Sequence, residues 1–383
     1  MTSEPVRLGA IGLGRGFALT AEALARHPDI ELIAAVARSP EARRAYDSSY
    51  TGRAFETLDE MLADDPIEMV YVATSHGMHG SHAIACMQAG KHVVVEKPIA
   101  LTLSDADAMI TAARQNGVHL FVGPCHSFDD PVLKAAEIIA SGRLGNVRML
   151  HALNCTDFLY RPRTPEELDT SRGGGVVFSQ AIHQIDVARR LMGRKARSVM
   201  AMTGKWDPTR PTEGAYSLLL RFENETFANL TYSGFAHFDS DIWMNNISEL
   251  GRRKSTSSYG NARRNLKKSA NETSQKNSRK FSGLELDNAP AHHEHFGPVI
   301  VFCDGGDLQL RADGVTLFGN ETIEDIECPF AYSRQSFADA IVSTVRHGQL
   351  PVQDGEWGKA SLEICYAILK SAETASPVDL HFQ

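Results

Sequence analysis

Apolar positions are spaced in two different ways along this chain of 383 residues. In the first third, short continuous apolar runs alternate with stretches of helical periodicity. Continuous runs are typical of strands buried on both faces, as in a parallel sheet that helices cover. We therefore predict an α/β, doubly wound parallel sheet in residues 1–124, with strands at 6–11, 30–36, 68–74, 92–95 and 118–122.

The remainder of the chain, residues 125–383, follows another pattern. Apolar and polar residues alternate there, which favours antiparallel strands, and the clearest runs are 147–154, 215–222, 226–233, 297–303 and 307–311. From about 332 to 375 the spacing becomes helical, with a break at 348–355. Runs of strands that follow a βα domain predict a second, α+β domain.

Composition narrows the class of protein. The net charge of −8 argues against nucleic-acid binding, and no apolar run approaches the length of a membrane span. The first residues lack the basic and apolar regions of a signal peptide, so we expect a cytoplasmic protein. The six cysteines are scattered without C-x-x-C spacing, which predicts reduced thiols and no metal site.

One segment, at about 250–282, departs from this average. Between residues 252 and 280 it holds ten Lys or Arg and a single acid, Glu272. Its low hydrophobicity predicts a polar excursion with a short helix around 262–269. A solvated insertion is the simplest interpretation; an anion-attracting flap and a subunit contact are the alternatives.

A glycine-rich turn follows the first predicted strand. The sequence Gly12-Leu13-Gly14-Arg15-Gly16 stands between that strand and a helical stretch. Gly12 permits a tight turn, Gly14 lets the backbone approach a pyrophosphate, and the free N–H groups of the helix face the anion. Phe17 occupies the position of the third fingerprint glycine, and Gly16 lies one residue early. The context predicts a Rossmann dinucleotide site.

The end of the second strand bears on the choice of cofactor. Enzymes that use NAD usually place an acidic residue there, which accepts from the ribose hydroxyls. This chain has Ala37-Arg38-Ser39 instead, and a guanidinium with a hydroxyl suits a 2′-phosphate. The cofactor is thus expected to be NAD(P), and Arg38 and Ser39 favour NADP. Glu41 remains an alternative acceptor for the ribose.

The strand His92–Val95 runs directly into Glu96-Lys97-Pro98. In open α/β sheets ligands bind outside the carboxyl ends of the strands, so Lys97 lies where chemistry is expected. An ordinary turn after a strand is the competing interpretation.

A second cluster follows a run of glycines at 173–175. Glycines in such a run mark a tight turn or the close approach of a ligand. The helix after them places Ser179, Ile182, His183 and Asp186 on one face. A histidine in a helix is more often a satisfied core residue than a catalytic one.

Together these stretches resemble the Gfo/Idh/MocA oxidoreductases. The resemblance rests on Gly12-x-Gly14, Ala73-Thr74 with His79, Glu96-Lys97-Pro98, and the glycine run that leads to His183. It covers essentially the whole chain. It implies a Rossmann domain and a C-terminal domain with a large, mainly antiparallel open sheet that packs subunits into a homodimer or homotetramer.

The motifs described above and the resemblance together indicate the site residues. Lys97 and His183 are the expected catalytic pair. The cofactor-binding candidates are Gly12, Gly14, Arg15, Gly16, Arg38, Ser39, Thr74, His76, His79 and Glu96. The substrate candidates are Lys97, His126, Asn154, Arg161, Arg163, Arg172, Ser179 and His183. No metal ligand is among them, and Ser179 stands where the family usually has an aspartate.

Within the family, the stretches 156–163, 171–186, 207–216 and 237–241 look most like phthalate 4,5-cis-dihydrodiol dehydrogenases. This similarity implies a small-molecule substrate and an NAD(P)-dependent dehydrogenase that oxidises a cis-dihydrodiol carboxylate, such as 4,5-dihydro-4,5-dihydroxyphthalate, to a catechol. A sugar, inositol or glycoside dehydrogenase of the same family is one alternative. A family glycosidase that uses NAD for transient oxidation is another.

Overall fold

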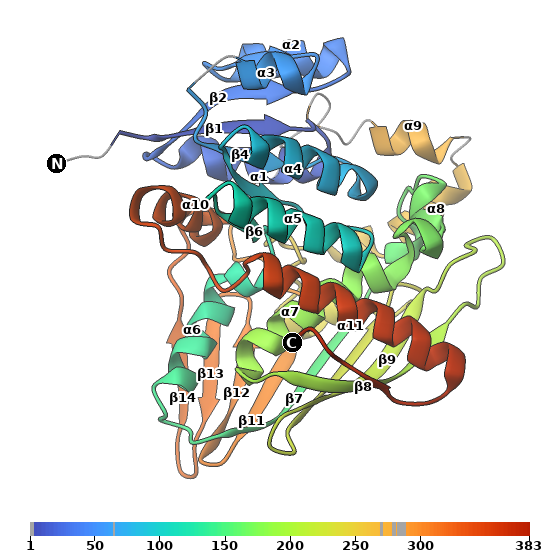
Figure 1. Cartoon of the computed structure of the whole chain (residues 1–383). Coiled ribbons are helices and arrows are strands. Elements are labelled where there is room, and N and C mark those ends of the chain that lie inside the picture. The colour runs from blue at the N-terminus through green and yellow to red at the C-terminus, as the bar shows by residue number, and fades with distance from the viewer. Residues whose placement is uncertain (1–3, 64–65, 269–270, 278–280, 282–288) are drawn as a thin grey trace. The chain divides into compact units, whose positions relative to one another are not determined.

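The computed structural model describes residues 4–63, 66–268, 271–277, 281 and 289–383. The chain forms two compact units (Figure 1). The first holds the described residues up to Pro124, those within 274–286, and Arg334–Leu362; the second holds the others. No described helix combines the length and the apolar character that crossing a membrane requires.

The first unit contains a six-stranded parallel sheet in the order β3-β2-β1-β4-β5-β6. Its strands are β1 (Val6–Ile11), β2 (Ile30–Val36), β3 (Arg53–Phe55), β4 (Met69–Val72), β5 (His92–Val95) and β6 (Leu120–Val122). The five strands expected from apolar runs are all present, shortened by up to two residues at an end. The strand order reverses between β1 and β4, and a crevice for a dinucleotide forms at such a switch point.

Helices connect these strands and bury apolar faces against the sheet. They are α1 (Arg15–Arg26), α2 (Pro40–Ser49), α3 (Leu58–Ala63), α4 (His79–Gln88) and α5 (Leu103–Gln115). Near the end of the chain come α10 (Gln335–His347) and α11 (Gly355–Thr374), and α10 packs against β1 and α1. Val93, Val94 and Val95 of β5 are fully buried, which explains why these three positions are all apolar.

The second unit contains a nine-stranded sheet in the order β14-β13-β12-β11-β7-β10-β9-β8-β15. All pairs are antiparallel except β7 with β10. The strands are β7 (Val147–Cys155), β8 (Ala196–Gly204), β9 (Ala215–Phe222), β10 (Phe227–Ser233), β11 (Val299–Cys303), β12 (Gly306–Arg311), β13 (Gly314–Phe318), β14 (Ile323–Glu327) and β15 (Val378–Asp379).

One face of this sheet is covered by α6 (Asp130–Ala140) and α7 (Ile182–Met192) (Figure 1). The sheet's other face carries a row of paired residues that includes Ile300, His151, Leu219 and Met200, all of them exposed. The period of two in each strand therefore separates a core face from an open face.

The basic segment is partly helical. It contains α8 (Asn261–Lys268), within one residue of the expected helix, and α9 (Glu272–Asn277); residues 269–270 and 278–280 lie outside the described part of the chain. Arg263 donates to the carbonyls of Phe235 and Ala236, and its guanidinium lies 4.0 Å from the centre of the Tyr160 ring. The part of the segment around Arg263 is therefore anchored to the second unit, although a solvated insertion was the simplest expectation.

Candidate active site

The glycine turn between β1 and α1 has the backbone that a dinucleotide site requires. Gly12 has φ +90°, and a Cβ added there would lie 2.7 Å from the carbonyl oxygen of Ala73. Gly14 precedes the helix, and no side chain caps the first turn of α1. The N–H groups of that turn thus face outward from the end of β1, which suits a pyrophosphate.

Glu96 ties the glycine turn to the end of β5. Its Oε1 accepts from the Tyr71 hydroxyl at 2.9 Å, and its Oε2 accepts from the backbone N–H of Lys97 at 3.2 Å. The same carboxylate lies where a Cβ on Gly16 would be 3.0 Å from Oε1. Glu96 therefore sets the position of Lys97 relative to the phosphate turn.

A further hydrogen bond holds α1 in place. The Thr20 hydroxyl donates to the Gly16 carbonyl at 3.0 Å and accepts from Arg334 Nη1 at 2.6 Å. Arg334 has φ +62° and stands just before α10. The C-terminal helix pair thus stabilises the N-terminal turn, an arrangement that no local pattern predicts.

His79 is fully buried and connects the loops after β4 and β5. Its Nδ1 lies 2.9 Å from the Pro98 carbonyl oxygen, and its Nε2 lies 3.2 Å from the Thr74 carbonyl oxygen. Burial lowers the pKa of this imidazole. The geometry gives His79 a positioning role beneath Lys97-Pro98, a bond that has the cis conformation. His76 lies one turn earlier, with its ring against that of His79.

The loop after β2 carries both a positive and a negative side chain, Arg38 and Glu41. Ser39 caps α2 by accepting from the Ala42 N–H, and its hydroxyl donates to Glu41 at 2.7 Å. Arg43 is held by the Ala37 and Arg38 carbonyls. The Arg38 side chain is exposed, so a guanidinium and the Glu41 carboxylate both stand beside the expected adenine ribose.

In the second unit, the carboxylate of Glu213 lies against the glycine run. Gly173 and Gly175 both have φ +77°, which confirms the tight turn. A Cβ on Gly175 would lie 2.0 Å from Glu213 Oε1, and that carboxylate accepts from the Val177 N–H. The group that approaches these glycines closely is therefore Glu213, which fixes the start of the next helix.

That helix begins with a π-helical turn over Val177–Ala181 and continues as α7. Ser179 donates to the Gly175 carbonyl within this turn. Single π turns inside α-helices often occur at functional sites. The turn changes the regular spacing of three and four residues that the sequence suggests between Ser179 and His183.

His183 lies in an aromatic environment near the N-terminus of α7. Its ring centre is 4.7 Å from that of His126 and 4.9 Å from that of Phe296. One turn later, Asp186 accepts from the Ser127 N–H at 2.9 Å. His126 in turn shares a 2.6 Å hydrogen bond with Asp129. The substrate candidates His126 and His183 are thus side by side.

The arginine candidates differ in their partners. Arg161 contacts Asp157 and Glu249, and although burial alone would lower its pKa, Glu249 raises it. Arg163 lies 3.5 Å above the centre of the Phe158 ring, and burial lowers its pKa to about 10. Among described residues, its Nε has no hydrogen-bond partner. Arg172 is exposed and pairs with Glu166.

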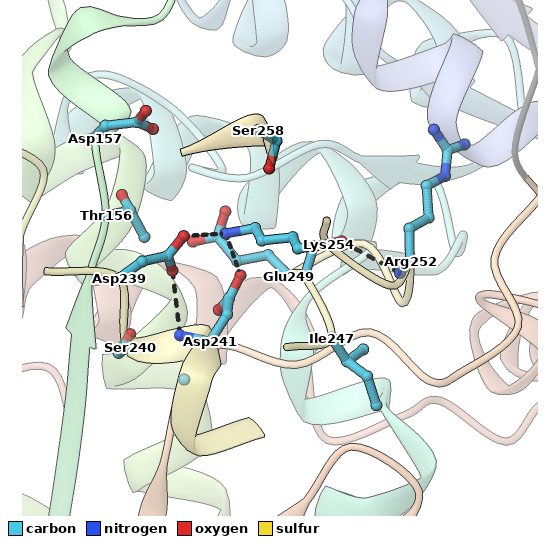
Figure 2. Close-up of polar contacts among 12 residues, drawn as sticks. Thr156, Asp157, Asp239, Ser240, Asp241, Ile247, Glu249, Arg252, Lys254 and Ser258 are labelled. Carbon is cyan, nitrogen blue, oxygen red and sulfur yellow. Dashed lines mark hydrogen bonds and ion pairs between the residues drawn. The ribbon is translucent and has the colours of Figure 1, made fainter. Parts of the chain in front are cut away.

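Glu249 joins the remaining candidate, Asn154, to a charged network (Figure 2). Asn154 Nδ2 donates to Glu249 at 3.0 Å. Nearby, Lys254 forms ion pairs with both Asp239 and Asp241. Figure 2 shows Asp239 and Asp241 joined to the Lys254 ammonium group, with the Glu249 side chain nearby. These acids were not among the candidates, because they are brought together only by the tertiary fold.

Two family models match the chain. One, described as the oxidoreductase family with an NAD-binding Rossmann fold, matches residues 6–124. The other, the GFO/IDH/MocA C-terminal domain, matches residues 132–251. The two matches fall on the two sheets described above, although the second sheet extends beyond its model.

Several known proteins are similar over all or half of the chain. The 1-carboxy-3-chloro-3,4-dihydroxycyclohexa-1,5-diene dehydrogenase of Comamonas testosteroni is 39% identical over 96% of this chain and 95% of that protein. The myo-inositol 2-dehydrogenase of Thermotoga maritima is 34% identical over 51% of this chain and 58% of that protein.

Solved structures agree with these similarities. A crystal structure from Bordetella bronchiseptica RB50 has a TM-score of 0.93 at 36% identity and covers 98% of this chain and all of its own. The WlbA dehydrogenase of Bordetella pertussis, in complex with NADH and UDP-GlcNAcA, has a TM-score of 0.71 at 22% identity, with 99% of both chains covered. The chain therefore belongs to the Gfo/Idh/MocA oxidoreductase family and is a nicotinamide-dependent dehydrogenase.

Proposed function

We propose that this dehydrogenase oxidises a cyclic secondary alcohol, best a cis-dihydrodiol carboxylate such as 4,5-dihydro-4,5-dihydroxyphthalate, to a catechol. The observation that carries this proposal is the similarity over nearly the whole chain to a relative named for a carboxylated dihydroxycyclohexadiene. The resemblance inferred from residues 156–163 and 171–186 agrees with it.

Bound NAD(P) would supply the hydride acceptor for this oxidation. The chain's own task is to orient the alcohol and remove its proton. We assign orientation and polarisation of the hydroxyl oxygen to Lys97, which the Glu96 carboxylate holds at the end of β5. We assign to His183 the removal of the hydroxyl proton. An exchange of these two roles is the alternative mechanism.

Arg163 is the arginine that best fits a substrate carboxylate. Its guanidinium lies 3.5 Å from the centre of the Phe158 ring. Nη1 contacts Glu167 at 3.5 Å and Nη2 donates to the Phe158 carbonyl, whereas Nε has no partner among described residues. A planar fork matches a carboxylate in a bidentate fashion. Arg161 is largely neutralised by Glu249 and Asp157, so we give it the supporting role of fixing the loop.

The chemistry of a dihydrodiol favours the forward direction. Removal of hydride from one carbinol carbon and of the proton from its hydroxyl gives a hydroxyketone. Loss of a proton from the neighbouring carbinol carbon, with protonation of the ketone oxygen, then gives the catechol. The regained aromaticity makes this tautomerisation favourable. A saturated inositol ring would not gain this stabilisation.

Inositol oxidation is the second candidate, because a relative with that name is 34% identical over half of the chain. A spectrophotometric screen separates the candidates: cis-dihydrodiol carboxylates, inositols and aldoses are each offered with NAD and with NADP. We expect reduced cofactor to accumulate fastest with a dihydrodiol carboxylate. A kcat/KM that is higher for inositols would contradict the proposal, and release of aglycone from glycosides without net reduced cofactor would identify a glycosidase.

We also propose that the chain forms a homodimer or homotetramer through the open face of the nine-stranded sheet. That face leaves apolar side chains such as Met202, 75% exposed, in contact with water. Burial of contiguous apolar surface is a main driving force for association.

A further inference from the structure

Three side chains converge beside His183 without belonging to any motif in the sequence. His126, Asp129 and Glu294 each offer one ligand atom, and these atoms lie within 4.8 Å of one another. We infer that these three residues form a binding site for one divalent transition-metal ion. The inference rests on this geometry and does not depend on which alcohol the enzyme oxidises.

The three residues are fixed by separate elements of the second unit. His126 opens a short 3₁₀ turn, His126–Phe128, and Asp129 immediately precedes α6. Asp129 stands at the N-cap position but its side chain does not cap the helix; instead it contacts His126 Nδ1 at 2.6 Å. Glu294 lies in the segment before β11 and accepts from the Ser333 hydroxyl at 3.2 Å.

Because the three side chains are largely buried, the two carboxylates are electrostatically unfavourable unless a cation is bound. The side chains of His126 and Asp129 are each 11% exposed, and Glu294 is 8% exposed. Two carboxylates that share one poorly hydrated site repel each other, and the cost is relieved by a bound positive charge. A divalent ion supplies more charge than one imidazolium proton, and it accepts all three groups as ligands.

The site also has room for a further ligand. A cavity of about 20 Å³ is lined by all three residues, together with His295 and Phe296. This volume is roughly that of a single water. A metal with three protein ligands keeps an open position for water or a substrate oxygen in catalytic sites.

The donor set indicates which ions fit. Ligand atoms about 2.1 Å from a common metal lie roughly 3 to 4 Å apart, so small side-chain movements would complete the coordination. One imidazole nitrogen with two carboxylate oxygens suits Zn²⁺ or Mn²⁺. Mg²⁺ prefers oxygen ligands and retains several waters, so it should bind less tightly.

The test uses the full-length protein after removal of metal with a chelator. Titration with MnCl₂, followed by electron paramagnetic resonance, should show one tight site per chain, since thiols compete poorly for this ion. Asp129→Asn and Glu294→Gln should each weaken Mn²⁺ binding by about tenfold or more. Mn²⁺ should also raise the thermal midpoint of the wild type but not of these variants.

His292 and Asp313 provide a matched control. Their Nδ1–Oδ2 distance is 2.7 Å, like that of His126 and Asp129, but among described residues no third ligand joins them. Asp313→Asn should leave the stoichiometry and the affinity for Mn²⁺ unchanged. Equal losses in Asp313→Asn and Asp129→Asn would overturn the assignment.

A measurement on the wild type keeps the inference testable if the variants fail to fold. With one equivalent of ZnCl₂ bound, X-ray absorption should show an imidazole nitrogen and oxygen ligands and no sulfur. Sulfur ligands, or no stoichiometric binding of either ion, would mean that the three residues form only an ion-paired cluster.

Discussion

At the scale of single residues, contacts within the first unit help to place Lys97. The Glu96 carboxylate accepts from its N–H, and the buried His79 supports the next residue through the Pro98 carbonyl. A lysine held in this way can meet a substrate oxygen without a large loss of side-chain entropy. Such positioning is what an acid–base or polarising group requires.

We predict that Lys97→Met lowers kcat by about 10² to 10⁴, because a positioned proton-transfer or polarising group contributes that much. Initial rates of cofactor reduction with the substrate found in the screen measure the change. Lys91→Met, which removes the same charge at the opposite end of β5, is the control and should stay within about threefold of wild type. A Lys97→Met rate within that range would remove Lys97 from the mechanism.

Arg38 is the second residue with a direct test. We predict that the enzyme prefers NADP and that Arg38→Ala lowers kcat/KM for NADP by about tenfold or more while changing that for NAD little, since a charged hydrogen bond to the 2′-phosphate is lost. Arg44→Ala, one turn into α2 and paired with Glu41, is the control. A wild-type preference for NAD that Arg38→Ala leaves unchanged would assign the ribose to Glu41.

At the scale of elements, two charged clusters of the second unit set local structure. Glu213 fills the space beside Gly175 and holds the π-helical start of α7, so the position of His183 depends on a residue just before β9 that is distant in sequence. The Lys254 cluster fixes the first residues of the basic segment against the 3₁₀ turn Ser240–Met244 (Figure 2). Both clusters bury carboxylates, which makes their stability sensitive to protonation.

The pKa of Asp241 determines in which direction stability changes with pH. It is 1% exposed, and burial raises its pKa to about 7, against the opposing effect of Lys254. Because the folded value lies above the ordinary value of 3.8, the unfolded chain loses this proton first and stability falls as pH rises from about 4 to about 7. We predict that the thermal midpoint of the wild type minus that of Asp241→Asn is smaller at pH 8 than at pH 5 by at least about 2 °C.

Asp304 is the control for this pH effect. Hydrogen bonds from Arg148 and Asn146 lower its pKa from 3.8 to about 2, so its contribution is lost only as pH falls from about 4 to about 2. The thermal midpoint of wild type relative to Asp304→Asn should therefore stay constant between pH 5 and pH 8. An Asp241→Asn difference that is equally flat would contradict the raised pKa.

At the scale of the whole molecule, one face of the nine-stranded sheet is open and leaves apolar side chains exposed. A single chain gives no reason for this exposure. Leu219 lies on β9, between β10 and β8. It pairs with Asn229 and Met200 and is 44% exposed. We predict an oligomer in light scattering, and we expect Leu219→Lys to shift the mass toward the 41.9 kDa monomer, because a charge cannot be buried unpaired.

Leu350→Lys is the control for the oligomer, since Leu350 is similarly exposed, at 41%, but lies between α10 and α11 in the first unit. It should leave the mass unchanged. A wild-type chain that is monomeric at micromolar concentration would show that the open face binds no second copy.

The sequence by itself determined the features that depend on local periodicity and short spacing. Continuous apolar runs indicated β1, β2, β4, β5 and β6, since strands buried on both faces have few polar positions. The spacing of Gly12 and Gly14 after β1 indicated the dinucleotide turn, and Lys97 followed from its place at a strand end. Alternation likewise gave much of the second sheet.

Only the tertiary structure decided the contacts between residues distant along the chain. The pairing of Arg334 with Thr20, of Glu213 with Gly175, and of Glu249 with Arg161 joins segments that no local pattern connects. The same holds for Glu294, which reaches His126 and Asp129 through the folding of the second unit. Burial makes these pairings important for stability, because an unpaired charge costs much free energy only away from water.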